Sequence, residues 1–240
     1  MTDGAGTVDS GVAERLLRAA TGPGGGGPVR WSAAPLVAAE RVLELCCGTG
    51  VLADELPAGH WLGVDRGVTP AARRPLLRAS PCALPLRDNA VDAVAILLAL
   101  PRLPDLDATF AEVRRVLRPR GTLVVVVPSA APRSVRELRL APLLSPVHRS
   151  GWRHRAALDQ TGWLLAAADF AVLSDDRVPF ALPIPDVAAA HDLVADLPRA
   201  GLWPPDLPAA VRTRVAAGLA SRAGHGRMLP IPLRRLVARR

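Results

Sequence analysis

The 240-residue sequence contains no tyrosine and no lysine, and it has a single asparagine and only three cysteines. Cys46, Cys47 and Cys82 are too few and too unevenly spaced for a disulfide framework or a zinc site. Histidines and carboxylates also form no cluster with the spacing of metal ligands, so no metal is expected. A reducing cytoplasm is the simplest compartment for such a chain.

Long hydrophobic runs are also lacking. The longest apolar stretches, residues 93–100 and 123–127, fall far short of the roughly 20 residues that a helix needs to cross a bilayer. The N-terminal residues have neither the basic start nor the apolar core of a secretory signal. We therefore expect no membrane partner.

Hydrophobic residues make up half of the chain, which is enough for a sizeable core and excludes global disorder. The formal net charge is +8, and all 30 basic residues are arginines. These arginines are spread along the chain, with the tightest groups at residues 114–120 and 234–240. A basic surface attracts polyanions, but this spread does not favour a dedicated nucleic-acid partner.

From Arg41 onward, short apolar runs alternate with helical stretches. The expected strands are residues 41–46, 61–64, 91–98 and 122–127, and the expected helices are residues 51–56, 71–77 and 107–117. Strands that alternate with helices predict βαβ units, and hence a mostly parallel sheet with helices on both faces.

Four parts of the chain are predicted from these patterns. Further along, residues 153–167 are expected to be helical, and residues 170–173 and 228–236 to form strands. The predicted parts are an N-terminal helical segment at 1–40 with a flexible glycine-rich joint at 22–28, a core at 41–178, a helical insertion at 179–225, and a final strand at 226–240. We expect the first and third parts to form a lid.

The sharpest motif is VLELCCGTG at residues 42–50. It places an acid, Glu44, near the end of a strand, and a turn of small residues then leads into a helix. Glycines let the backbone approach a ligand closely, and a helix N-terminus offers unpaired N–H groups. This segment resembles the first motif of the Rossmann-like class I S-adenosylmethionine-dependent methyltransferases, with Glu44 in place of the usual aspartate and Cys46 in place of the first glycine.

Three further segments follow in the order of that family: LGVD at residues 62–65, ALPLRDNAVDAV at 83–94, and FAEVRRVLRPRGTLVVVVP at 110–128. The resemblance therefore covers residues 41–128. It implies a doubly wound, mostly parallel sheet of seven strands. It also implies a cofactor over the carboxyl ends of the first, second and fourth strands, where open sheets place ligands.

The resemblance implies a site for S-adenosylmethionine and its product S-adenosylhomocysteine. Glu44 would orient the methionine part, and Asp65 would bind the ribose hydroxyls. Ser80 stands where the family commonly has an aspartate for adenine, and Pro81 lacks the N–H that the family often offers to the adenine ring. The full set of candidate cofactor-binding residues is Glu44, Cys46, Cys47, Gly48, Thr49, Gly50, Asp65, Arg66, Ser80, Pro81 and Leu97.

The implied reaction is methyl transfer to an oxygen, nitrogen or carbon atom of a small-molecule acceptor. This displacement needs mainly alignment and exclusion of water, so the sequence need not show a catalytic residue. His148 and His154 are weak candidates for a general base, because an imidazole titrates near neutrality. Trp31 is a candidate to cover the cofactor, and Trp152, Trp163 and Trp203 are candidates to line an apolar substrate cavity, with core packing as the default role of a tryptophan.

Three alternatives stay open. Residues 48–53 also fit the GxGxxA form of a dinucleotide-binding fingerprint, but Asp65 follows too early and the fingerprint does not explain the later motifs. The departures at Cys46, Ser80 and Pro81 allow a methyltransferase-fold protein that binds, assembles or catalyses a non-methyl reaction. The arginine content allows a nucleic-acid or protein methyltransferase. No pattern predicts the oligomeric state.

Overall fold

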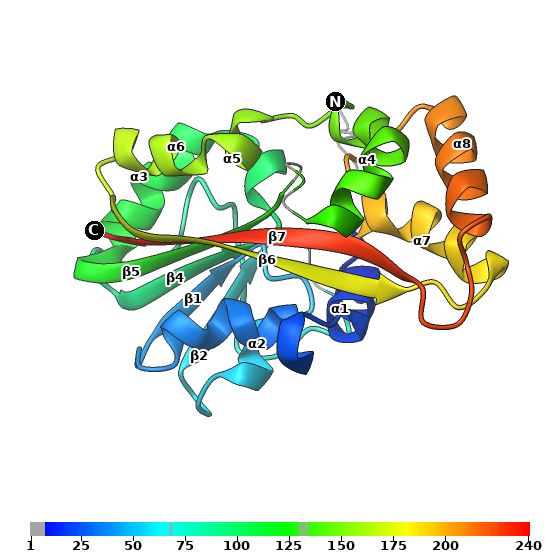
Figure 1. Cartoon of the computed structure of the whole chain (residues 1–240). Helices are drawn as coiled ribbons and strands as arrows, with labels where there is room; N and C mark the ends of the chain where they lie inside the picture. The colour runs from blue at the N-terminus through cyan, green and yellow to red at the C-terminus, as the bar shows by residue number, and fades with distance from the viewer. Residues whose placement is uncertain (1–7, 68, 130–131, 133) are drawn as a thin grey trace.

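A seven-stranded sheet forms the centre of the computed structural model, which describes residues 8–67, 69–129, 132 and 134–240 (Figure 1). The strand order is β3-β2-β1-β4-β5-β7-β6. The first five strands run parallel, and β7 is antiparallel to both of its neighbours. The strands are β1 (Val42–Leu45), β2 (Trp61–Asp65), β3 (Leu76–Arg78), β4 (Val91–Leu97), β5 (Leu117–Pro128), β6 (Ala171–Pro183) and β7 (Met228–Arg239).

Helices cover both faces of the sheet, as the sequence predicts. The α-helices are α1 (Ser10–Ala19), α2 (Pro28–Ala33), α3 (Leu106–Val116), α4 (Val135–His148), α5 (Ala156–Asp159), α6 (Thr161–Ala167), α7 (Val187–Arg199) and α8 (Ala209–Ala220). Short 3₁₀ helices are η1 (Pro23–Gly25), η2 (Ala34–Leu36), η3 (Val51–Glu55) and η4 (Leu100–Arg102). Helices α3, α5 and α6 lie on one face, and α1 and α2 on the other (Figure 1).

Strand β4 shows why its residues 93–97 are all apolar. Ala93 and Ala95 belong to the core shared with α1, α2, α4, α7 and α8, whereas Val94 and Ile96 belong to the core shared with α3, α5 and α6. Successive side chains of a strand point to opposite faces, so a strand covered on both faces reads as a continuous hydrophobic run.

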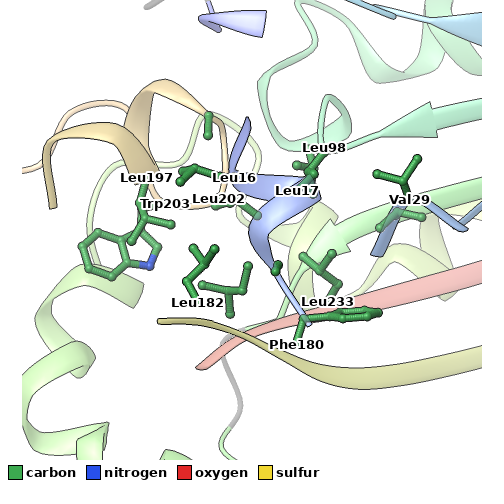
Figure 2. Packing of buried hydrophobic residues seen from close by; sticks show 14 of the residues in the cluster. Leu16, Leu17, Val29, Leu98, Phe180, Leu182, Leu197, Leu202, Trp203 and Leu233 are labelled. Carbon is green, nitrogen blue, oxygen red and sulfur yellow. The ribbon is translucent and has the colours of Figure 1, made fainter. Parts of the chain in front are cut away.

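Helix α1 is held in place by one of these cores. Figure 2 shows Leu16 and Leu17 of α1 among side chains from β6, β7 and the segment after α7. Both leucines are buried, as are Phe180 of β6 and Trp203. The N-terminal segment is therefore packed onto the C-terminal part of the chain.

Four local expectations need correction. Residues 71–77 do not form a helix: Arg74–Pro75 is a cis peptide, and Leu76 begins β3, which pairs with β2. Pro75 has no backbone N–H for a helical hydrogen bond, which disfavours a helix here. The predicted helix at 51–56 is the 3₁₀ helix η3. The glycine-rich segment 22–28 is no free joint, since it contains η1 and its neighbour Thr21 bridges Ala181 in β6. Strand β6 extends through Pro183, so the predicted insertion begins inside a strand.

The proline-glycine segment near the start of β5 forms a bulge. Leu117 pairs with Val91, and the next pair along the strands is Thr122 with Ala93. Residues 118–121 are therefore left out of the strand pairing with β4, and Arg120 takes a positive φ of 64°. Beyond the bulge, β5 runs between β4 and β7 in the middle of the sheet.

None of the helices in the described residues is both long enough and apolar enough to cross a membrane.

Candidate functional site

A cavity of about 470 Å³ lies at the carboxyl ends of β1, β2 and β4. One part of its wall is the loop after β1 and the turn after β2. A second part is residues 97–104, which follow β4, and α1 covers both. Arg153 and Ala200 complete the wall from distant parts of the chain. Parallel sheets bind ligands at this edge of their strands.

Most of the candidate cofactor-binding residues meet in this cavity. Gly50 and Ser80 are the two that do not line it. The ones that line it are Glu44, Cys46, Cys47, Gly48, Thr49, Asp65, Arg66, Pro81 and Leu97.

The two exceptions shape the wall from behind. Gly50 has a φ of 77°, and a Cβ there would lie 2.6 Å from the ring of Trp61. Only glycine fits this position without strain. The Ser80 hydroxyl accepts hydrogen bonds from Arg66 Nη2 at 3.0 Å and from the Cys82 backbone N–H at 3.3 Å.

Glu44 is a buried carboxyl group in the wall. Glu44 is the next-to-last residue of β1, and its Oε2 accepts a hydrogen bond from Trp61 Nε1 at 2.8 Å. Burial raises the pKa of Glu44 to about 8, because a carboxylate loses its hydration there. The group is thus poised to stabilise a cation that enters the cavity.

Asp65, at the end of β2, connects the glycine loop to the turn that follows β2. Its Oδ2 accepts from the Gly48 N–H and its Oδ1 from the Gly67 N–H, both at 2.9 Å. Close by in sequence, Thr69 also lines the cavity. The Thr69 Oγ1 is buried and has no hydrogen-bond partner in the described part of the chain. No motif in the sequence distinguishes this threonine.

The paired cysteines are inert thiols. Burial raises the pKa of Cys46 to about 12 and also raises the pKa of Cys47. A thiol must ionise to act as a nucleophile or metal ligand. Cys46 takes a positive φ of 54°, a backbone conformation that favours glycine. In the described residues, no group of three His, Cys, Asp or Glu side chains is placed to hold a metal ion.

The β4 side of the cavity contains a functional residue that the sequence analysis missed. Arg102, in η4, lines the cavity, and its Nη2 donates to the Leu98 carbonyl at 3.2 Å. Its Nε and Nη1 are buried, with no hydrogen-bond partner among the described residues. Burial lowers the pKa of Arg102 to about 10, so the guanidinium is still charged at neutral pH.

The two candidate histidines lie outside the cavity wall. The Nε2 of His154 is 2.9 Å from the Leu103 carbonyl, a contact that ties residues 153–155 to the segment after β4. His148 ends α4, and burial lowers its pKa. The tryptophans proposed near the ligands also lie outside the wall, namely Trp31, Trp152, Trp163 and Trp203.

Helix α1 closes the cavity and is anchored by charge. Arg73 donates to Glu14 of α1 at 2.8 Å and to Asp54 of η3 at 2.7 Å, and Arg18 also pairs with Asp54. The hydrogen bond from Arg73 lowers the pKa of Glu14 to about 2. At the start of the helix, the Ser10 Cβ is so close to Gly48 that a side chain at Gly48 would overlap it.

Comparison with known proteins agrees with this geometry. Residues 43–125 match the family described as "Methyltransferase domain". Over these residues the chain therefore resembles a methyltransferase domain. The resemblance inferred from the four sequence motifs is thereby confirmed.

Curated proteins are similar to this chain over about a hundred residues. A demethylmenaquinone methyltransferase of Mycolicibacterium paratuberculosis is 38% identical over 93 residues, which are 36% of this chain and 40% of that protein. One of Thermus thermophilus is 35% identical over 104 residues, 37% of this chain and 47% of that protein. The chain thus spans less than half the length of these relatives.

Solved structures show the same fold over most of the chain. The YcgJ protein of Bacillus subtilis superposes with a TM-score of 0.55 and 15% identity, over 88% of this chain and 98% of that one. A structure described as a "Putative Type II Methyltransferase" from Anaeromyxobacter dehalogenans superposes with a TM-score of 0.55 and 20% identity, over 88% of this chain and 93% of that one. At these identities the likeness concerns the fold, and it confirms the predicted Rossmann-like, seven-stranded arrangement.

Proposed function

We propose that this protein transfers a methyl group from S-adenosylmethionine to a small-molecule acceptor. The observation behind the proposal is that nine candidate cofactor-binding residues, from the carboxyl ends of four strands, line a single cavity. A volume of about 470 Å³ falls within the range of sites for small molecules. The curated relatives, named as demethylmenaquinone methyltransferases, also act on a small molecule by name.

The side chains present fit this cofactor. Asp65 and the unpartnered Thr69 hydroxyl both line the cavity and are polar groups suited to ribose hydroxyls. Glu44 gains stability as a carboxylate once the cationic amine of the methionine part lies nearby. Because Ser80 is already bound to Arg66, we assign the adenine side of the cavity to Arg66 and Pro81 instead.

When bound, the cofactor supplies an electrophilic methyl group on its sulfonium. The chain contributes position and exclusion of water, and positioning alone is worth about 7–11 kcal/mol of a barrier. We assign the covering role to the N-terminal segment 1–40 and the insertion 179–225, which reach the wall through α1 and Ala200. The protonated thiols of Cys46 and Cys47 do not compete with the acceptor as nucleophiles.

The free thiols of Cys46, Cys47 and Cys82 also suit a reducing compartment. We therefore propose that the reaction takes place in the cytoplasm.

Calorimetric titration with S-adenosylmethionine and S-adenosylhomocysteine tests the cofactor site. We expect micromolar binding of both, and we expect Asp65→Asn to weaken it by about 10- to 100-fold, because hydrogen bonds to a charged group are worth about 1.5–3 kcal/mol. Asp192→Asn, at an exposed position of α7, is the matched control and should bind as the wild type does. Absence of heat up to millimolar ligand would contradict the proposal.

A second measurement separates methyl transfer from mere binding. The protein is incubated with S-adenosylmethionine that carries a labelled methyl group and with a panel of small hydroxylated and amino compounds. Transfer of the labelled methyl group to one of these compounds, reduced in the Asp65→Asn variant, supports the proposal that the protein is a methyltransferase. Tight cofactor binding without transfer to any member would favour the alternative of a non-methyl reaction or a binding module.

A further inference from the structure

The guanidinium of Arg102 is an unpaired cation inside the cavity. An arginine side chain has five N–H donors, and the Leu98 carbonyl takes one of them. Nε and both hydrogens of Nη1 have no acceptor among the described residues, and the second hydrogen of Nη2 is also left without one. A buried charge without a partner is unfavourable, which indicates that a ligand supplies the acceptor.

The fold reserves space for this side chain. Gly201 has a φ of 73°, and a Cβ at that position would overlap the Arg102 guanidinium. The surrounding wall is apolar, with Leu98, Leu103 and Pro104 around the charged group. No described acidic side chain forms an ion pair with Arg102, although many other arginines of the chain do form such pairs.

Charge is distributed unevenly around the cavity. Its acidic wall residues come from α1, β1 and β2, namely Glu14, Glu44 and Asp65. The basic residues of the wall are Arg66, which follows β2, and on the β4 side Arg102 and the exposed Arg153, so the β4 side has positive charge and no acid. The planar fork formed by Nη1 and Nη2 matches the two oxygens of a carboxylate, and one buried positive charge matches a single negative one.

We propose that Arg102 is the binding site for a carboxylate group in this cavity, and that the methyl acceptor is an acid whose carboxylate it holds. The identity of the acceptor rests on the proposed function, whereas the carboxylate site does not. Arg153, at the rim, adds to the attraction. The cofactor has a carboxylate of its own in its methionine part, so the experiment distinguishes these two sources.

The test begins with a simple carboxylate. Benzoate is titrated against the full-length protein, with benzamide as its neutral analogue, and the binding is followed by calorimetry with and without saturating S-adenosylhomocysteine. We expect benzoate to bind at millimolar strength in both conditions and benzamide to bind at least tenfold more weakly. Binding of benzoate without cofactor is independent of the methyltransferase proposal, so the two can fail separately.

Variants assign the effect to the guanidinium. Arg102→Met keeps the length of the side chain and should lose benzoate binding by at least tenfold, with an unchanged or higher melting temperature. Arg102→Lys keeps the charge without the fork and should bind with intermediate strength, and it serves as the second variant if the first does not fold. Arg155→Met, at a nearby exposed position outside the cavity wall, should bind benzoate as the wild type does.

The pattern of results names the source of the carboxylate. Retained benzoate binding in the presence of S-adenosylhomocysteine assigns the site to the acceptor. Competition between the two, with Arg102→Met weakening S-adenosylhomocysteine but not 5′-methylthioadenosine, assigns it to the cofactor and overturns the acidic acceptor. A wild-type protein that does not distinguish benzoate from benzamide, together with unchanged cofactor affinity in Arg102→Met, overturns the carboxylate site altogether.

Discussion

At the β1–β2 end of the cavity the acidic side chains already have partners in the protein, whereas at the β4 end a cation has few. Asp65 accepts from two backbone N–H groups, and Glu44 accepts from Trp61. Arg102 uses one of its five donors. The first end is a preformed frame for its acidic groups, with the Thr69 hydroxyl left for a ligand. We propose that a ligand completes the second end.

The largest expected effect concerns the preformed end. Gly50→Ala forces a Cβ to within 2.6 Å of the buried Trp61 ring and places alanine at a φ of 77°. Left-handed strain costs about 1–2 kcal/mol and overpacking about 1–3 kcal/mol, so unfolding in urea should show a loss of about 2–5 kcal/mol. Cofactor affinity should fall as well, because Trp61 positions Glu44.

Two other glycines serve as controls for that substitution. Gly59 has a similar φ of 80° and open space around it. The unfolding free energy of Gly59→Ala should therefore fall only through backbone strain, by about 1–2 kcal/mol. At the β4 end, Gly201→Ala meets the far end of a flexible arginine, which can move aside. The loss of unfolding free energy in Gly201→Ala should lie between the losses in Gly50→Ala and Gly59→Ala. Equal losses for Gly50→Ala and Gly59→Ala would show that the Trp61 contact has no energetic weight.

The sequence predicted the first end of the cavity well, because its residues lie close together in the chain. Glu44, the glycine loop and Asp65 fall within 22 positions, and the alternation of strands and turns places them at one edge of the sheet. The departure at Cys46 was also visible in the motif. Local patterns were enough here because short connections in βαβ units hold neighbouring strand ends together.

The second end could not be predicted for the same reason. Arg102 is one of 30 arginines and lies between prolines, with no motif to distinguish it. Its neighbours in space, Arg153 and Gly201, are some 50 and 100 residues away in the chain. The pairing of Arg73 with Glu14, 59 residues apart, is equally invisible. Convergence of distant segments depends on packing, which a local pattern does not encode.

The next effect in size is a pH dependence at the preformed end. The folded state raises the pKa of Glu44 from 4.5 to about 8, so it binds a proton more tightly than the unfolded chain does. Stability from this group is therefore complete below pH 4.5 and is lost as the pH rises toward 8. Glu44→Gln imitates the neutral form of the side chain. Between pH 4.5 and 8 its free energy of unfolding in urea should therefore fall less than that of the wild type, by a few kcal/mol.

The matched control for this pH series is Glu40→Gln, which changes an exposed carboxyl four residues earlier. Its unfolding free energy should follow the wild-type slope. Parallel slopes for the wild type and Glu44→Gln would mean that the Glu44 carboxyl titrates alike in the folded and unfolded chains. Binding of the cofactor should also release a proton in this pH range, measurable as a heat that varies with the ionisation enthalpy of the buffer.

The smallest expected effect concerns the cover that the two ends share. Arg73→Met removes the ion pairs from Arg73 to Glu14 and Asp54. Because the arginine is partly exposed, we expect local opening of α1 to become easier by about 1–2 kcal/mol, which is roughly a 5- to 30-fold faster amide exchange. Hydrogen exchange of residues 10–19 measures this, and Arg74→Met, at the exposed neighbouring position, is the control.

The position of the faster exchange decides which end of the cavity depends on the cover. Acceleration confined to α1 and the glycine loop means that Arg73 closes the preformed end alone. Acceleration that also reaches residues 97–104 means that α1 holds the Arg102 side in place too. Unchanged exchange throughout would show that Leu16 and Leu17, packed as in Figure 2, suffice to hold the helix without the ion pairs.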